Sequence, residues 1–370
     1  MTNSRKPLVT TLSFVVDGHG DLTKKFLNPH QLGSMASARL QLMPALKSIQ
    51  KLGYEVSIHS LHSDYPQDIS ELKKSDICLI GKMSANKPKL VDSMAVANLA
   101  AITRLKNKGA LIVTQHCDNI FHHQDNLKDF YEDLFKLSDC IIYPCKALRE
   151  LTHSYVNSST REYIVPDPWQ LENSHQPRDL KDGETLRIIW FGSNKNIHYL
   201  WEHIPKILDN ITYNGKIELT ILAQRWAIDK IKKCFKSLNK SYPNWLIRFV
   251  LWQINQQPQQ LEAEISRAHI CLVPSDPRDP LKIGVSHNRI VDATKGGCIV
   301  VASPMKSYLE LSEIAVLNES IPDALSYSII NYKDLTKQLI TKRTDSLEEF
   351  SPMNNLKNWN KTWKSILTTS

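Results

Sequence analysis

The sequence predicts an α/β protein with two Rossmann-like, doubly wound parallel-sheet domains that face a cleft. A chain of 370 residues is longer than one compact core normally accommodates, so two domains are expected. Short apolar runs alternate with longer amphipathic stretches along almost the whole chain, as strand–helix–strand units around a parallel sheet do. A polar, aperiodic passage near the middle separates two such alternating halves.

Residues 1–167 are predicted to form the N-terminal domain. The strand candidates are "LVTTLSFVVD", "EVSIHSL", "DICLIG", "ALIVTQ", "CIIYPC" and "REYIVPD". The clearest helix candidate between them is "SMASARLQLMPALKSIQKLG". There Leu42, Leu46 and Ile49 recur at helical spacing, and Gly53 stands at the expected C-cap position.

Residues 168–185 are polar and lack periodicity, so we interpret them as a linker. Residues 186–345 repeat the alternating scheme with the strand candidates "LRIIWFG", "IELTILA", "IRFVLWQ", "HICLVPSD" and "CIVVAS". Residues 346–370 indicate a helical segment broken at Pro352. Its apolar residues, Trp359 and Trp363 among them, need a surface to cover, so this segment is a candidate to cross back to the N-terminal domain.

Composition limits the class of protein. Hydrophobic residues at 42% and charged residues at 23% are typical of a folded globular chain. No stretch approaches the roughly 20 apolar residues that span a bilayer, and the start of the chain lacks a signal-peptide layout, so we expect a cytoplasmic protein. The seven cysteines form no C-x-x-C pair, which argues against disulfides and against a zinc site. No metal site is predicted.

The net charge of +8 would suit a polyanion, an anionic membrane face or a phosphorylated small molecule. Lysines are spread over many predicted helices, where they are most often solvated. The chain has no zinc finger, aromatic RNA-binding motif or glycine–arginine tract, so a nucleic-acid partner is not expected.

One candidate phosphate site is "WFGSNKNIHYL", where a predicted strand ends at Gly192 and a turn with Ser193 and Lys195 leads into a helix. Glycine permits close backbone approach, and free amides at a helix start attract phosphate. A plain strand-to-helix turn remains the alternative. The chain has neither G-x-G-x-x-G nor G-x-x-x-x-G-K-[ST], which disfavours dinucleotide-dependent redox chemistry and P-loop chemistry.

The second candidate is "KIGVSHNRIVDATKGGCIVVAS", which follows the predicted strand "HICLVPSD". Lys282 and Arg289 would donate to a diphosphate, the arginine as a planar fork and the lysine as a movable point charge. Asp292, one turn into the following helix, could accept hydrogen bonds from a ribose diol. Taken alone, Asp292 is equally consistent with an ordinary surface acid.

With these motifs the sequence resembles the nucleotide-sugar-dependent glycosyltransferases of the GT-B fold, particularly the large retaining "glycosyl transferases group 1" (family 4-like) family. "VDATKGGCIVVAS" is similar to the second part of that family's "E-G-F-G…E-A-x-A-x-G-x-P-V-V-A-S" pattern, with Asp292 in place of the ribose-binding glutamate. "SDCIIYPCKALRELT", "YIVPDPW" and "ISRAHICLVPSD" resemble further family segments in the same order. The resemblance covers most of the chain.

The sequence departs from the family pattern at the first of its two glutamates, which would fall at Gly284. "KIGVSHNR" supplies His287 and other polar residues there, of which we assign Ser286 and Asn288 to the donor site beside Lys282 and Arg289. The departure concerns the donor sugar more than the nucleotide.

The resemblance also implies an acceptor side in the N-terminal domain. His116 and Asp118 follow the strand "ALIVTQ", where related enzymes often carry a histidine that contacts the transferred sugar. Asp118 could orient His116 or receive the proton of an acceptor hydroxyl. Gly33 and Ser34 precede the first long helix, where the family has a glycine-rich loop. A lone histidine is, without the family match, more often structural.

The predicted function is transfer of a sugar from a nucleoside diphosphate donor to an acceptor hydroxyl, with retention and without a metal. The nucleotide sugar is a co-substrate, and no further cofactor is expected. The acceptor would be a sugar, a glycan or a lipid-linked molecule, and the basic charge is compatible with peripheral contact at the inner membrane face. Two alternatives stay open: a nucleotide-sugar epimerase on the same fold, and a non-catalytic nucleotide-sugar-binding or scaffold protein.

Overall fold

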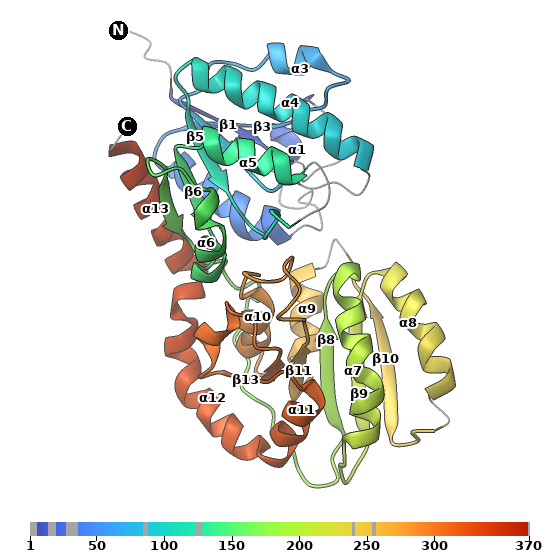
Figure 1. Ribbon diagram of the computed structural model, residues 1–370. Helices are drawn as coiled ribbons and strands as arrows, with labels where there is room; N and C mark the ends of the chain where they lie inside the picture. Colours follow the sequence, from blue (N-terminus) through green and yellow to red (C-terminus); the bar gives the residue numbers. More distant parts are fainter. Residues whose placement is uncertain are drawn as a thin grey trace. The chain divides into compact units, whose positions relative to one another are not determined.

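The computed structural model describes residues 6–13, 20–26, 36–83, 88–122, 127–238, 241–253 and 257–368. The chain forms two α/β units, each around its own sheet (Figure 1). The first unit comprises Met1–Pro168, Ile283–Ser286 and Pro352–Ser370, and the second comprises Trp169–Lys282 and His287–Ser351. The first unit is therefore assembled from three separate stretches of the chain.

The first unit contains a seven-stranded sheet in the order β2-β3-β1-β4-β5-β6-β7. Every neighbouring pair is parallel except β2 and β3. The strands are β1 (Leu8–Leu12), β2 (Gly20–Asp21), β3 (Glu55–Ser60), β4 (Ile77–Ile80), β5 (Leu111–Gln115), β6 (Cys140–Tyr143) and β7 (Arg161–Ile164). The helices are α1 (Thr23–Phe26), the π-helical η2 (Ala38–Leu42), α2 (Met43–Lys51), α3 (Pro66–Ser70), α4 (Pro88–Asn107), α5 (Leu127–Leu137), α6 (Lys146–Thr152), the 3-10 turn η3 (His153–Tyr155) and α13 (Pro352–Thr368).

Both faces of this sheet are covered, so its strands are apolar on both sides, as expected for a parallel sheet. In β4, Cys78 and Ile80 belong to a core cluster with residues of α4 and α5. The alternate residues Ile77 and Leu79 belong to a second cluster with residues of α2 and α13. The two-residue period of the strand thus distributes its side chains between two cores.

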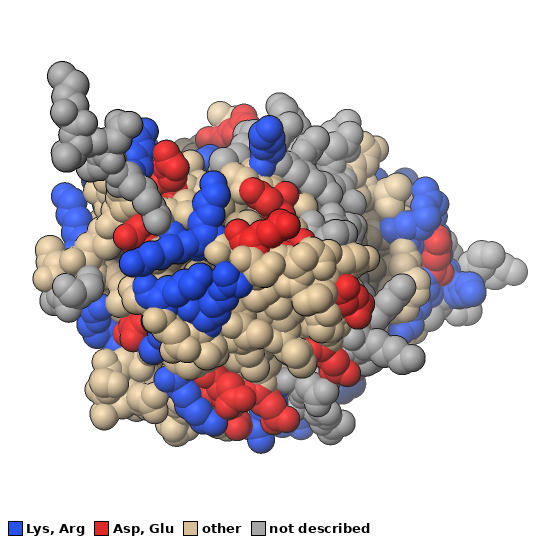
Figure 2. All heavy atoms as spheres, turned by 90° about the horizontal axis from the view of Figure 1, so that it is seen from above, with Lys and Arg blue, Asp and Glu red and all other residues tan. Residues whose placement is uncertain are grey.

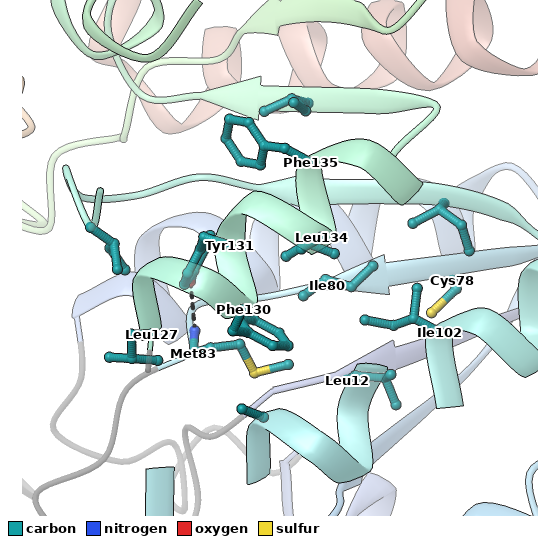
Figure 3. Close-up of a cluster of buried hydrophobic side chains, with 14 of the residues drawn as sticks. Leu12, Cys78, Ile80, Met83, Ile102, Leu127, Phe130, Tyr131, Leu134 and Phe135 are labelled. Carbon is teal, nitrogen blue, oxygen red and sulfur yellow. Dashed lines mark hydrogen bonds between the residues drawn. The ribbon is translucent and has the colours of Figure 1, made fainter. Parts of the chain in front are cut away.

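Figure 3 shows the core on the α4 and α5 side, where aromatic and aliphatic side chains of several elements interdigitate. The backbone amide of Met83 donates a hydrogen bond to the hydroxyl of Tyr131 of α5 at 3.0 Å (Figure 3). That bond satisfies a buried amide just beyond β4. It therefore fixes the loop that leaves the carboxyl end of the strand.

The last helix of the chain belongs to the first unit. On α13, Trp359, Trp363 and Ile366 are buried in the core beside α2. The indole Nε1 of Trp363 donates to the carbonyl oxygen of Ala45 at 3.1 Å, and Ser48 donates to Asn360 at 2.6 Å. Burying two tryptophans makes α13 a part of this core.

The second unit contains a six-stranded sheet in the order β10-β9-β8-β11-β12-β13, and all neighbouring pairs are parallel. The strands are β8 (Leu186–Phe191), β9 (Ile217–Ala223), β10 (Trp245–Leu251), β11 (Ile270–Val273), β12 (Ile299–Ala302) and β13 (Ala315–Leu317). The helices are η4 (Asn194–Asn196), α7 (Ile197–Asn210), α8 (Arg225–Leu238), α9 (Gln257–Ile265), α10 (Asn288–Lys295), η6 (Tyr308–Leu311), α11 (Ile321–Ile330), α12 (Tyr332–Leu347) and η7 (Glu348–Phe350), of which η4, η6 and η7 are 3-10 turns.

The irregular segment that follows Trp169 is held against the second unit by Glu262 of α9. This carboxylate is 9% exposed and accepts from the amide of Glu172, from Asn173 and from the ring of His175, at 2.7–3.3 Å. Burial alone would raise the pKa of Glu262, but these hydrogen bonds hold it down at about 2. A charged carboxylate therefore anchors the segment.

The predicted α/β class with two parallel sheets is confirmed. Each strand candidate of the sequence is found as a strand, and the structure adds β2 and β13 at sheet edges. Both additions are short, and β2 is the antiparallel exception.

Candidate functional site

In the second unit, the loops at the carboxyl ends of β8 and β11 carry the predicted donor residues. Gly192 follows β8, and a Cβ added there would lie 3.0 Å from the ring of Trp190. The glycine therefore accommodates a buried indole. Ser193 and Lys195 are exposed on the turn that leads through η4 into α7.

Lys282 is brought to this same turn. Its ammonium donates to Oδ1 of Asn196 at 2.9 Å and lies 5.9 Å from the ring centre of Tyr199. The hydroxyl of Tyr199 donates to Asp279, and burial together with this carboxylate raises the pKa of the tyrosine. The β11 loop and the start of α7 thus bring Lys282 into the neighbourhood of Lys195, as an anion site requires.

Arg289 lies in the first turn of α10 and is half-buried. Its Nη1 is buried and has no hydrogen-bond partner among the residues that the structure describes. Burial raises the pKa of the nearby Cys271 thiol to about 12, although the charge of Arg289 opposes the shift. A buried guanidinium nitrogen without a partner is costly, and an anionic ligand would satisfy it.

Asp292, the predicted ribose ligand, is 1% exposed. Its two carboxylate oxygens accept from the backbone amide and the side-chain Nε2 of Gln170, each at 2.8 Å. In this conformation Gln170 thus occupies both carboxylate oxygens of Asp292, which a ribose diol would need as acceptors. Asn288, at the start of the same helix, is half-buried.

Ile283–Ser286 belong to the first unit, in contrast to the rest of the predicted donor motif. The hydroxyl of Ser286 donates to Asp167 at 2.6 Å. Gly284 has φ +83°, and a Cβ added there would lie 2.9 Å from the Cα of Leu148. The position where the family carries a glutamate therefore has neither the backbone conformation nor the space for one.

In the first unit, His116 follows β5 and is 0% exposed. Its ring is enclosed by Phe121, Tyr131, Phe135 and Tyr143, with centroids at 5.0–5.9 Å. Neither ring nitrogen has a hydrogen-bond partner within the described part of the chain. Burial lowers the pKa of His116 to about 3, so the ring is neutral and out of reach of a substrate in this conformation.

Asp118, two residues further on, is an accessible polar group at this edge. Its carboxylate forms an ion pair with the ammonium of Lys82, and the two side chains are 37% and 24% exposed. Burial favours the neutral amine, but Asp118 raises the pKa of Lys82 above its usual value. The structure thus offers a charged carboxylate and a charged ammonium at the carboxyl ends of neighbouring strands β4 and β5.

Sequence reasoning missed Lys82, Asn196 and Gln170. Lys82 could have been found, because it directly follows the predicted strand "DICLIG". That strand ends at the same sheet edge as "ALIVTQ", which His116 and Asp118 follow. Asn196 stands in a turn already singled out, but its partner Lys282 is 86 residues away. No local pattern indicates that Gln170 contacts an acid 122 residues later.

Two predicted positions remain without a structural description, because Gly33 and Ser34 lie outside the described residues. Within the described ranges, no group of three or more His, Cys, Asp or Glu side chains is placed to hold a metal ion. In the same ranges no helix is long and apolar enough to cross a membrane.

Figure 2 shows how charge is distributed on one face of the molecule. The largest group of Lys and Arg side chains on this face has Asp and Glu side chains near it, and further Lys and Arg side chains are scattered toward the edges of the view. Neighbouring charges of opposite sign screen one another at the surface. The half-buried Lys282 and Arg289 are therefore stronger indications of an anion site than the net charge of +8.

Comparisons with known proteins show the fold. No family model matches the chain, and no curated protein matches its sequence. Among solved structures, a sucrose-phosphate synthase from Thermosynechococcus elongatus matches with a TM-score of 0.64 at 11% identity, over 99% of this chain and 100% of that one. The Anabaena protein HepE, solved with UDP and glucose, matches with a TM-score of 0.64 at 10% identity, over 99% and 100%. A glycosyltransferase from Rickettsia africae gives 0.60 at 12% identity, over 99% and 100%. The chain therefore has the predicted GT-B fold along its whole length.

Proposed function

We propose that this protein is a glycosyltransferase that moves a sugar from a nucleoside diphosphate donor to an acceptor hydroxyl. The observation that carries the proposal is the buried Nη1 of Arg289 in the first turn of α10, which has no hydrogen-bond partner among the described residues. Lys282 and Lys195 add two cations at loops from the same edge of the sheet. Together they provide the charge that a diphosphate needs.

In the proposed reaction the anomeric carbon loses its bond to the diphosphate oxygen and gains one to the acceptor oxygen. Negative charge develops on the departing diphosphate, and Arg289, Lys282 and Lys195 would stabilise it without a metal. Transfer with retention places the acceptor on the face that the diphosphate leaves. Backbone amides after Gly192 would contribute further donors.

The acceptor proton needs a base, for which Asp118 is our candidate in the first unit. Its carboxylate is 37% exposed, so a hydroxyl can reach it. The neighbouring His116 would act through packing in this conformation, because its ring is fully buried. Its contact with a transferred sugar remains an expectation from the family resemblance.

A non-catalytic nucleotide-sugar-binding protein is the second candidate, and Gly284 favours it. The position of the family's sugar-facing carboxylate has no room for a side chain. Such a protein would bind the donor without breaking the anomeric bond.

Uridine nucleotides are the first donors to test, because similar structures were solved with UDP and glucose and with UDP-glucose. The acceptor class we expect is a sugar, a glycan or a lipid-linked molecule in the cytoplasm.

The test is a screen of the full-length protein with nucleoside diphosphates and their sugars. We expect a diphosphate to raise the melting temperature, since a ligand that binds only the native state stabilises it. Donor hydrolysis or transfer should release the nucleoside diphosphate. Binding without release would favour the non-catalytic candidate, and no binding of any nucleotide would overturn both.

A further inference from the structure

A groove of about 510 Å³ lies in the first unit, beside α2 and the first turn of α13. Its volume is within the usual range of small-molecule sites, roughly 300–1,000 Å³. Lys47, Gln50 and Lys51 line it from α2, and Asn355 lines it from α13. Among the described residues that line the groove none is acidic, so this lining is cationic.

Within the described part of the chain, the two lysines of this groove have no carboxylate counter-ion. Neither Lys47 nor Lys51 forms an ion pair with a carboxylate that the structure describes, whereas Lys106 of the same unit pairs with Asp139 at 3.2 Å. They stand four positions apart on α2, where like charges repel one another. An anion between them would relieve that repulsion and form charge-assisted hydrogen bonds.

The rest of the lining is apolar and lies where the chain leaves the first unit after Pro168 and returns to it at Pro352. Pro168 ends the first stretch of that unit, and Pro352 begins its last stretch. Asn355 ties the two stretches together, because its Nδ2 donates to the carbonyl oxygen of Pro166 at 2.7 Å. The proline rings offer a surface for an apolar or ring-shaped body.

We propose that this groove is a second ligand site, which binds a small molecule carrying a phosphomonoester group. The phosphate lies between Lys47 and Lys51, and the body of the ligand packs on Pro168 and Pro352. Such a ligand contacts two of the four points at which the chain crosses between the units. The site is independent of the proposed donor site and of the proposed function.

The test uses phenyl phosphate as the ligand, with neutral benzyl alcohol of similar shape as its control. Hydrogen exchange of the full-length protein is measured at about 10 mM ligand, which largely fills a site of millimolar affinity. We expect slower exchange in residues 43–51 and 352–356 with phenyl phosphate only. Binding at the proposed donor loops would appear instead in residues 192–200 and 282–292.

The variant Lys47→Met/Lys51→Met should lose at least about tenfold in affinity, because both charged contacts are removed. Lys361→Met/Lys364→Met removes two exposed lysines from α13 and should bind as the wild type does. Lys47→Arg/Lys51→Arg keeps the charges and should retain binding, which separates charge loss from misfolding. Equal protection by benzyl alcohol, equal loss in the α13 variant, or no protection in the two named segments would each refute the site.

Discussion

The ammonium of Lys82 and the carboxylate of Asp118 form an ion pair across 36 residues of sequence, at the carboxyl ends of β4 and β5. The same two charges act on His116: Asp118 raises the pKa of the imidazole and Lys82 lowers it, while burial dominates. The pair is the charged part of this sheet edge. It is therefore the first place to alter on the proposed acceptor side.

Lys82→Met should lower donor turnover at least about tenfold if Asp118 serves as the base, because the ammonium that holds its carboxylate in place is lost. Lys82→Arg should keep most of the activity. The unfolding free energy should change by less than about 1 kcal/mol in either variant, since the pair is partly exposed. Turnover assays and urea denaturation measure the two effects. Wild-type turnover in Lys82→Met would show that Asp118 is not the base.

Arg289→Ala should weaken binding of nucleoside diphosphate by about 10- to 100-fold, because a charge-assisted contact to the diphosphate is lost. Arg278→Ala is the matched control, since Arg278 lies in the loop that follows β11 and its side chain is 90% exposed. Calorimetric titration with UDP measures both affinities. Equal affinity in Arg289→Ala and the wild type would remove this arginine from the site.

His116→Phe should preserve the fold, because it keeps an aromatic ring among Phe121 and Phe135 while removing both nitrogens. His116→Ala should cost about 2–4 kcal/mol of unfolding free energy through the cavity it leaves. Denaturation and turnover are measured on both variants. Full turnover in His116→Phe would show that His116 has no catalytic role, whereas inactivity of that folded variant would support such a role.

Acid should destabilise the fold below pH 6.5 through buried neutral histidines. Burial lowers the pKa of His269 to about 4 and that of His116 to about 3, so the unfolded chain takes up protons first as pH falls. Each contribution is complete above about 6.5 and is lost toward the folded pKa, at up to about 1.4 kcal/mol per pH unit.

His269 accepts from the amide of Arg187 at 2.9 Å, a bond that protonation removes. The unfolding free energy of His269→Gln should therefore depend less steeply on pH than that of the wild type. His153→Gln, at an exposed histidine, should leave the slope unchanged. A wild-type profile that is flat between pH 6.5 and 4 would contradict the assignment.

Gly284→Ala should cost more stability than Gly53→Ala. Both glycines have positive φ, at +83° and +92°, which costs an alanine about 1–2 kcal/mol. Only at Gly284 does the new Cβ also meet Leu148, whereas nothing lies within 4 Å at Gly53. Thermal denaturation compares the two variants. Equal losses of stability would show that the loop around Gly284 rearranges to accommodate the new Cβ without further cost.

The sequence predicted the fold because parallel strands buried on both faces are continuous apolar runs, such as "DICLIG" and "HICLVPSD". It did not predict β2 or β13, since two- and three-residue strands carry no periodicity. The sequence also did not predict the aromatic surroundings of His116, because these neighbours come from α5, β6 and a loop.

The candidate donor motif was visible locally, but its partners were not. The resemblance placed Asp292 by spacing, yet its contact with Gln170 depends on how an aperiodic segment returns to α10. Ser286 shared a motif with Arg289, but its hydroxyl contacts Asp167, 119 residues earlier. Such pairings depend on tertiary structure, and the roles of these residues remain predictions.

The position of α13 has a consequence for biosynthesis. Trp359, Trp363 and Ile366 complete a core whose remaining buried members precede Pro168, so the ribosome must make the entire second unit before that core can be completed. At about 5–20 residues per second, that interval is roughly 10–40 s. During it the apolar side of α2 is uncovered and exposed to chaperones. A released chain that ends at residue 351 should accordingly carry a folded second unit and a protease-sensitive first one.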